Sequence, residues 1–109
     1  MGEAARATDP APIFAALGDR TRLSLLMSLS DGQTRSITML SADSRLTRQA
    51  VTKHLRVLEG VGLVESVRHG RESRYGCRIE PLDAARAYLD RVAVQWDDAL
   101  MRLKAYVEK

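Results

Sequence analysis

The residues that decide the fold are 47–79, which read TRQAVTKHLRVLEGVGLVESVRHGRESRYGCRI. Thr47 can cap a helix in which apolar residues recur every three or four positions, and Gly60 and Gly62 mark its end. Two strand-like segments, 63–68 and 74–79, then flank the polar turn 69–73. This pattern predicts a helix followed by a β-hairpin.

Short helices are predicted before this stretch. Asp9 and Pro10 form a helix-start signal, and Gly18 ends the first helix. Asp19 or Thr21 can cap a second helix, whose apolar residues at helical spacing are Leu23, Leu26, Met27 and Leu29. A third helix is expected to begin at Ser36.

The last part of the chain predicts one long helix, starting near Pro81. Its apolar residues are spaced by three or four throughout: Leu82, Ala85, Leu89, Val92, Trp96, Leu100, Leu103 and Val107. Residues 1–8 are small and polar without periodicity, which indicates a flexible lead. We therefore expect a mainly α fold with about five helices and a two-stranded wing, as one domain over residues 9–109.

Composition excludes several classes of protein. The chain has 109 residues and a single cysteine, Cys77, which can form neither an internal disulfide nor a thiolate metal site by itself. No apolar run approaches the roughly 20 residues that span a bilayer, and residues 1–10 contain no secretory signal. These features predict a cytoplasmic protein without a membrane partner.

Positive charge is concentrated in the middle of the chain. Residues 45–78 have eight Arg or Lys against three acids, a net +5, whereas residues 1–44 and 79–109 each have a net charge of −1. Nucleic-acid binding proteins concentrate charge where they contact phosphate. The middle segment is therefore the predicted binding surface.

The order of helix, turn, capped helix and basic hairpin is that of a winged helix-turn-helix, whose second helix enters the major groove. If Val51, Leu55 and Leu58 face the core, the opposite face presents residue types that read DNA: Arg48, Gln49, Thr52, Lys53 and Arg56. In the hairpin, Arg68, His69, Arg71 and Arg74 suit contacts with phosphate. The alternative is that both groups are only solvated surface.

The quoted stretch resembles the recognition helix and wing of ArsR-family repressors, and FAALGDRTRLSLLMSL (residues 14–29) resembles that family's opening helices. The resemblance covers residues 10–79, with Thr52 where the family commonly has Ser. It implies contacts with double-stranded DNA from Arg48, Gln49, Thr52, Lys53, Arg56, Arg71 and Arg74. His54 matches the family's helix histidine, and it either contacts DNA or packs within the protein.

The resemblance also implies a homodimer built from the first and last helices. The apolar stripe of the last helix supports this, because it exceeds what one small core needs. The alternative is a last helix folded wholly onto its own domain. The expected interface residues are Ile13, Phe14, Leu89, Val92, Trp96, Leu100 and Leu103, with Trp96 as an apolar anchor.

The residues at the family's known metal sites are absent. Its thiolate site lies on the third helix, where this chain has residues 37–40 without cysteine, and its Asp and His site lies on the last helix, which here has no His. We expect no metal and no cofactor, and a structural thiol at Cys77 rather than a redox switch.

The sequence thus predicts a dimeric repressor that binds an inverted-repeat operator without the usual metal sensing, with an unknown small-molecule or protein effector. No catalytic constellation is present, so an enzyme is not expected. Two alternatives stay open: a metal- or thiol-responsive repressor with unrecognised ligands, and a winged helix used for protein contacts.

Overall fold

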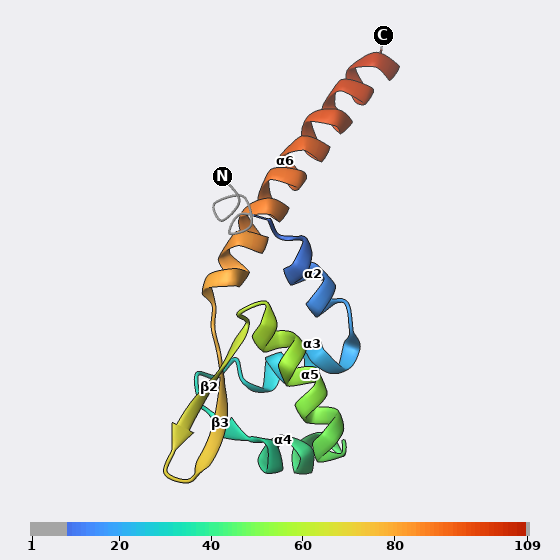
Figure 1. Ribbon diagram of the computed structural model, residues 1–109. Helices are drawn as coiled ribbons and strands as arrows, with labels where there is room; N and C mark the ends of the chain where they lie inside the picture. Colours follow the sequence, from blue (N-terminus) through green and yellow to red (C-terminus); the bar gives the residue numbers. More distant parts are fainter. Residues whose placement is uncertain (1–8, 109) are drawn as a thin grey trace.

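The computed structural model describes residues 9–108. The elements in chain order are α2 (Ala11–Leu17), α3 (Arg20–Ser28), β1 (Arg35–Ser36), α4 (Ile37–Ser44), α5 (Arg48–Gly60), β2 (Val64–His69), β3 (Glu72–Cys77) and α6 (Glu80–Val107). A body from α2 to β3 carries α6, which projects away from it (Figure 1). The predicted mainly α fold with a wing is confirmed. The lead predicted over residues 1–8 lies outside the described residues.

Side-chain caps begin three of the helices. Asp19 accepts a hydrogen bond from the amide of Arg22 at 3.0 Å, which selects Asp19 over Thr21 as the cap of α3. Ser36 caps α4, and Thr47 caps α5 by accepting from the amide of Ala50 at 3.0 Å. Each cap satisfies an amide that has no partner within the helix, so these helix starts follow from local sequence.

The predicted face of α3 is partly wrong. Leu26 and Leu29 are buried as expected, but Leu23 and Met27 are 45% and 66% exposed. Leu25 takes their place in the core at 2% exposure. The reason is tertiary: α3 is held between α2 and α5, and their contacts with α3 rotate its apolar stripe toward Leu25.

The sheet has a third strand that the sequence did not reveal. Its order is β1-β3-β2, with antiparallel pairing of Arg35 with Tyr75 and of Val64 with Cys77. The hairpin turn is also shorter than predicted. Because His69 pairs with Glu72, only Gly70 and Arg71 connect the strands.

The core lies where α5 meets the other elements. Val51, Leu55 and Leu58 of α5 have 0% exposure, and Leu29, Leu40 and Leu63 pack into the same cluster. Burial of these side chains is the main stabilising contribution to the fold. The opposite face of α5 is consequently presented outward.

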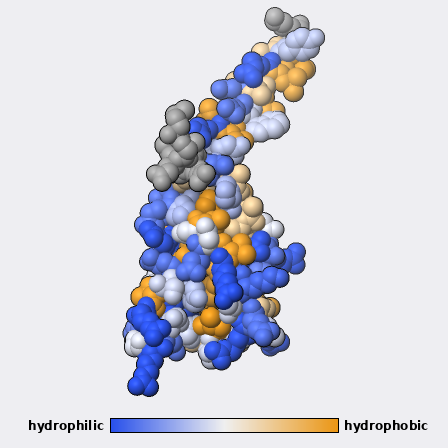
Figure 2. Space-filling view, viewed as in Figure 1, coloured by the Kyte–Doolittle hydropathy of each residue, from blue (hydrophilic) through white to orange (hydrophobic). Residues whose placement is uncertain are grey.

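Only the start of α6 belongs to this core. Ala85 is buried and Leu82 packs against the cluster, whereas the apolar side chains beyond Tyr88 are largely exposed along the projecting part of the helix (Figure 2). Within residues 9–108, no helix combines the length and the apolar character that crossing a membrane requires.

Candidate nucleic-acid interface

The outward face of α5 carries the polar side chains that the sequence singled out. Arg48, Gln49, Lys53 and Arg56 are exposed, and Thr52 is half-buried. The Thr52 hydroxyl donates to the carbonyl of Arg48 at 2.8 Å and keeps its acceptor capacity. All five line one open hollow, together with Ile37 and Val57. This set of side chains is therefore assembled on one surface.

His54 is separated from that surface. It does not line the hollow, it is half-buried, and its Nδ1 atom is buried without a hydrogen-bond partner in residues 9–108. The geometry favours the packing role for His54 over a contact with DNA.

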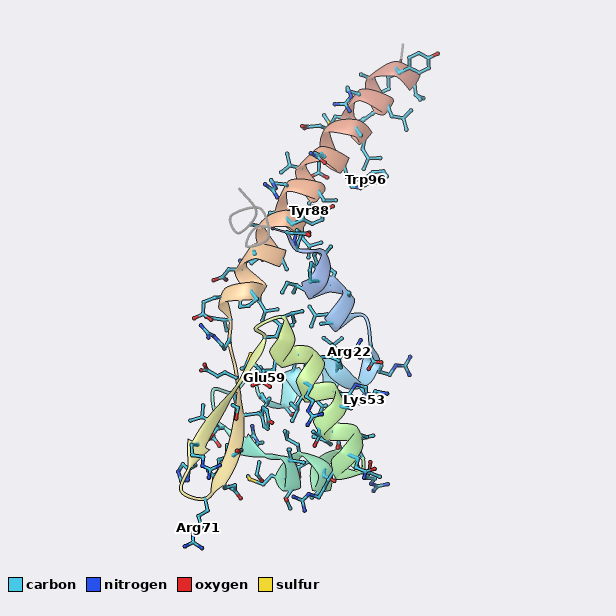
Figure 3. All side chains as sticks on the ribbon, viewed as in Figure 1. Arg22, Lys53, Glu59, Arg71, Tyr88 and Trp96 are labelled. Atoms are coloured by element: carbon cyan, nitrogen blue, oxygen red, sulfur yellow. The ribbon has the colours of Figure 1, made fainter. Side chains whose placement is uncertain are left out.

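The wing brings its basic residues close to the start of α5. Arg71 lies in the two-residue turn and extends beyond the tip of the hairpin (Figure 3). The Nε atom of Arg74 donates to the Glu72 carboxylate at 2.8 Å. A second hollow lies between the wing and α4, and its lining includes Arg48, Arg71 and Arg74. We call it the wing hollow.

Cations fall into two groups within residues 9–108. Five of them form ion pairs with nearby acids: Arg22, Arg35, Arg74, Arg78 and Lys104. By contrast, ten cations have no ion pair in this part of the chain, and five of these ten lie on α5 or the wing: Arg48, Lys53, Arg56, Arg68 and Arg71. The other five lie on α3, after α4 and on α6: Arg20, Arg45, Arg86, Arg91 and Arg102. The unpaired cations of α5 and the wing stand where phosphate could bind them.

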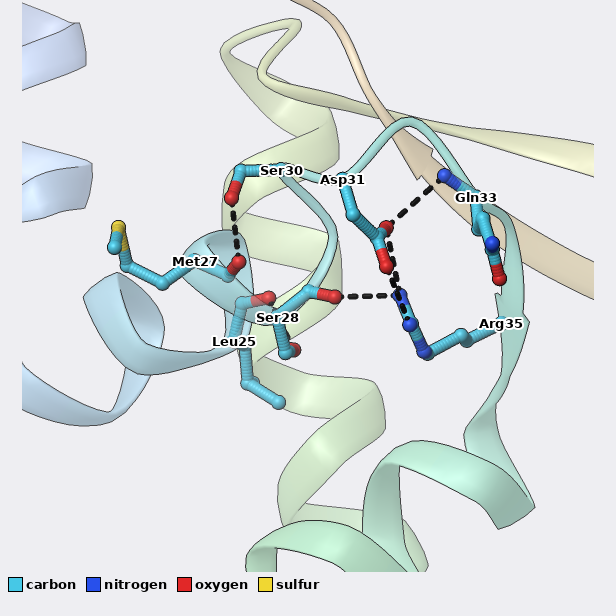
Figure 4. A network of polar contacts seen from close by, with 7 residues as sticks. All are labelled: Leu25, Met27, Ser28, Ser30, Asp31, Gln33 and Arg35. Carbon is cyan, nitrogen blue, oxygen red and sulfur yellow. Dashed lines mark hydrogen bonds and ion pairs between the residues drawn. The ribbon is translucent and has the colours of Figure 1, made fainter.

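One of the paired arginines holds the segment that leads into the helix-turn-helix (Figure 4). Arg35 donates to both carboxylate oxygens of Asp31, at 2.7 and 3.0 Å, and to the carbonyl of Ser28. The Arg35 guanidinium and the amide of Gln33 lower the pKa of Asp31 to about 2. This network ties the end of α3 to β1 and so positions the start of α4.

Metal ligands are not gathered in the described part of the chain. No group of three or more His, Cys, Asp or Glu side chains within residues 9–108 is arranged to hold a metal ion. Cys77 is half-buried, and burial raises the pKa of its thiol. A raised pKa lowers the thiolate fraction and therefore the reactivity of this cysteine.

Sequence reasoning missed part of this surface. Thr38 and Ser73 line the wing hollow; Thr38 stands on α4, away from the predicted DNA contacts of α5, and Ser73 stands on β3 next to Arg74. Neither residue type signals DNA contact by itself. Only the pairing of β1 with β3, which brings α4 beside the wing, could have indicated them.

Comparison with known sequences agrees with this geometry. The family model described as "Bacterial regulatory protein, arsR family" matches residues 19–66. The chain is 45% identical to the uncharacterised HTH-type transcriptional regulator YuzN of Bacillus subtilis, with 64% of this chain and 83% of YuzN covered. It is 38% identical to the HTH-type transcriptional regulator CmtR of Mycobacterium tuberculosis, with 75% of this chain and 69% of CmtR covered.

Solved structures show the same architecture. An ArsR-like transcriptional regulator from Rhodococcus sp. RHA1 has a TM-score of 0.76 at 38% identity, covering 95% of this chain and 94% of the other. A homodimeric winged helix-turn-helix DNA-binding domain from Mycobacterium bovis has a TM-score of 0.60 at 27% identity, covering 78% and 77%. These similar proteins are described as regulators and not as enzymes, in agreement with the sequence prediction.

Proposed function

Since the chain belongs to the ArsR family of bacterial regulatory proteins and is a DNA-binding transcriptional regulator, we propose that it is a dimeric repressor of an inverted-repeat operator. It acts in the cytoplasm and works without the metal sites of its family. The observation that carries the proposal is the unpaired, polar face of α5 beside a basic wing.

Recognition depends on α5 entering the major groove. Gln49 is suited to a bidentate contact with adenine, and Arg56 to one with guanine; each such contact discriminates by about 1–3 kcal/mol. Lys53 neutralises phosphate, while Thr52 offers its methyl group to thymine. The buried opposite face of α5 holds these side chains in a constant orientation, because it packs into the core.

Dimerisation uses the projecting part of α6. Beyond the turns that pack on the core, its residues include an unbroken series spaced alternately by three and four, which is the pattern of a two-stranded coiled coil: Leu89, Val92, Trp96, Ala99, Leu103 and Tyr106. Trp96, Leu100 and Leu103 are 62%, 56% and 58% exposed in the single protomer, which a second copy would cover.

The two residues proposed from α2 differ in what they can contribute. Ile13 is only 8% exposed within one protomer, so little of it is left for a partner. Phe14 is half-buried and packs against Tyr88 of α6, with ring centroids 5.8 Å apart. Phe14 therefore supports the position of α6, and its remaining exposed surface adjoins the proposed interface.

The proposal of a metal-independent repressor has its own test. The thiol of Cys77 stands without a second cysteine, and the two histidines lie in α5 and the wing. Equilibrium dialysis against zinc and copper is expected to show only weak binding. Stoichiometric tight binding would instead favour the metal-responsive alternative.

DNA recognition is tested by a mobility shift with duplex DNA from the chain's own promoter region. The wild type is compared with the double variant Gln49→Ala/Lys53→Ala and with Gln33→Ala/Lys104→Ala, which removes the same residue types away from α5. We expect sequence-selective binding that only the first variant loses. A log-log salt slope of about −0.9 per phosphate contact is also expected. Folded, dimeric wild type that binds no duplex would favour protein contacts instead.

A further inference from the structure

The wing hollow has more positive charge than the wing alone would bring to it. Arg48 reaches it from α5, and Arg71 and Arg74 reach it from the hairpin, against the single carboxylate of Glu72. Three guanidinium groups against one carboxylate leave an excess of two positive charges, and His69 lies beside them. The hollow is therefore built to attract an anion.

Neutral donors face the same hollow. Thr38, the second residue of α4, is exposed there, and so is Ser73 of the wing. The Ser36 side chain caps only the amide of Met39, so the amides of the two residues before Met39 have no partner within the helix. Hydroxyl and amide donors next to guanidinium groups form the chemistry that binds phosphate oxygens.

We infer that the wing hollow seats one phosphate of the DNA backbone, and that Arg48 binds this phosphate rather than a base. Arg48 lines both the wing hollow and the open hollow on the outward face of α5, so it stands where the backbone must pass when α5 lies in the groove. The seat determines the register of α5, because phosphate contacts orient a protein on the duplex. This inference deepens the proposed function and rests on it.

Glu72 weakens the seat. Its carboxylate accepts a hydrogen bond from the Nε atom of Arg74 at 2.8 Å, so this donor is not free for a phosphate. It also adds a negative charge beside the bound phosphate. The Arg74–Glu72 pair is partly exposed, and such pairs contribute little to folding stability. Neutralising Glu72 should therefore strengthen DNA binding without a comparable change in the fold.

The experiment measures binding to a random-sequence duplex over a range of salt concentrations, because a phosphate contact does not depend on sequence. Thr38→Glu is expected to weaken binding and to make the log-log salt slope shallower by about 1 per protomer. Its thermal stability should be unchanged or higher, because an acid at a helix N-terminus is favourable. Glu72→Gln is expected to bind more tightly than wild type.

Ala87→Glu is the matched control, since it changes net charge as Thr38→Glu does but lies exposed on α6. Equal affinity of Thr38→Glu and Ala87→Glu overturns the seat, as does a Glu72→Gln variant that binds no more tightly than wild type. Wild type that binds no duplex at all overturns the proposed function, and the seat with it.

A separate variant tests the role of Arg48. Arg48→Ala is expected to lower affinity by the same factor for operator and random duplex, leaving their ratio unchanged. A loss confined to the operator would show that Arg48 contacts a base and would overturn its assignment to the phosphate.

Discussion

At the residue scale, the wing depends on one glycine. Gly70 has a φ of +67°, and Arg71, the other turn residue, is not among the residues with positive φ. Positive φ at the first position alone is the pattern of a type II′ turn, whose twist suits a two-residue hairpin. The turn therefore requires glycine because of this positive φ. A steric clash is not the reason, since a Cβ at Gly70 would meet nothing within 4 Å.

Replacing Gly70 by alanine is expected to destabilise the protein by about 1–2 kcal/mol, the usual cost of positive φ for an L-residue. Urea unfolding followed by circular dichroism measures this change. Gly60→Ala is the control, because Gly60 lies in α5, has ordinary φ and also has open space. Equal stability of the two variants would contradict the assigned turn.

A second prediction at this scale concerns pH and Asp31. Because the Arg35 guanidinium and the amide of Gln33 lower the pKa of Asp31 to about 2, the folded protein holds this carboxylate ionised at lower pH than the unfolded chain does. Its stabilisation is complete above about pH 5 and is lost as the pH falls from about 4 toward 2.

Asp31→Asn should therefore lower the melting temperature at neutral pH, and the difference from wild type should vanish in acid. Thermal unfolding across the pH range measures it. Asp98→Asn, a change on exposed α6 surface, serves as the control and should show no such pH-dependent difference. If the melting temperature of Asp31→Asn stayed below that of wild type by the same amount down to pH 2, the substitution would act through something other than the charge of Asp31.

At the scale of elements, α6 combines two environments in one helix. It has 28 residues, a length of about 42 Å at 1.5 Å per residue. Its first turns pack on the core, while its later turns project with their apolar side chains exposed. The exposed turns follow the three-and-four spacing, so one face of α6 is suited to a partner helix and the opposite face is not.

Leu103→Ala is accordingly expected to weaken the dimer, whereas Met101→Ala, on the opposite face of α6, is expected to leave it unchanged. The two side chains are similarly exposed, at 58% and 65%. Loss of the leucine from both copies costs on the order of 1–3 kcal/mol, which raises the dissociation constant by about 5-fold to about 150-fold. Analytical ultracentrifugation measures the dissociation constant of the dimer. Equal effects of the two changes would contradict the proposed interface along one face of α6.

At the scale of the whole molecule, the proposed recognition surface on α5 and the wing lies at one end of the protomer, and the projecting part of α6 lies at the other (Figure 1). Two copies joined through α6 would hold their two recognition helices at a set separation. Binding to DNA should then depend on the distance between half-sites as well as on their sequence.

Once footprinting has located the operator, inserting about 5 base pairs between the half-sites turns one of them by half a helical turn. Affinity is expected to fall to that of an isolated half-site. Replacing the same number of central base pairs without changing the length is the control. Unchanged affinity after the insertion would show that the two protomers bind independently.

Local sequence was enough to predict the features that depend on neighbouring residues. Capping residues marked where helices begin, although Asp19 and Thr21 were both open for α3 until the structure selected Asp19. Periodicity identified the buried face of α5, because this signal too acts within a few residues. The polar face proposed for DNA recognition followed directly, since it is the side of α5 that the core leaves outward.

Tertiary structure decided the features that depend on residues far apart in the chain. It rotated the face of α3, paired the two-residue β1 with β3, and turned His54 away from the recognition surface. It also joined α4, α5 and the wing around one basic hollow. None of these is encoded in a local pattern, because each results from long-range packing and strand pairing that override or add to the local preferences of the residues involved.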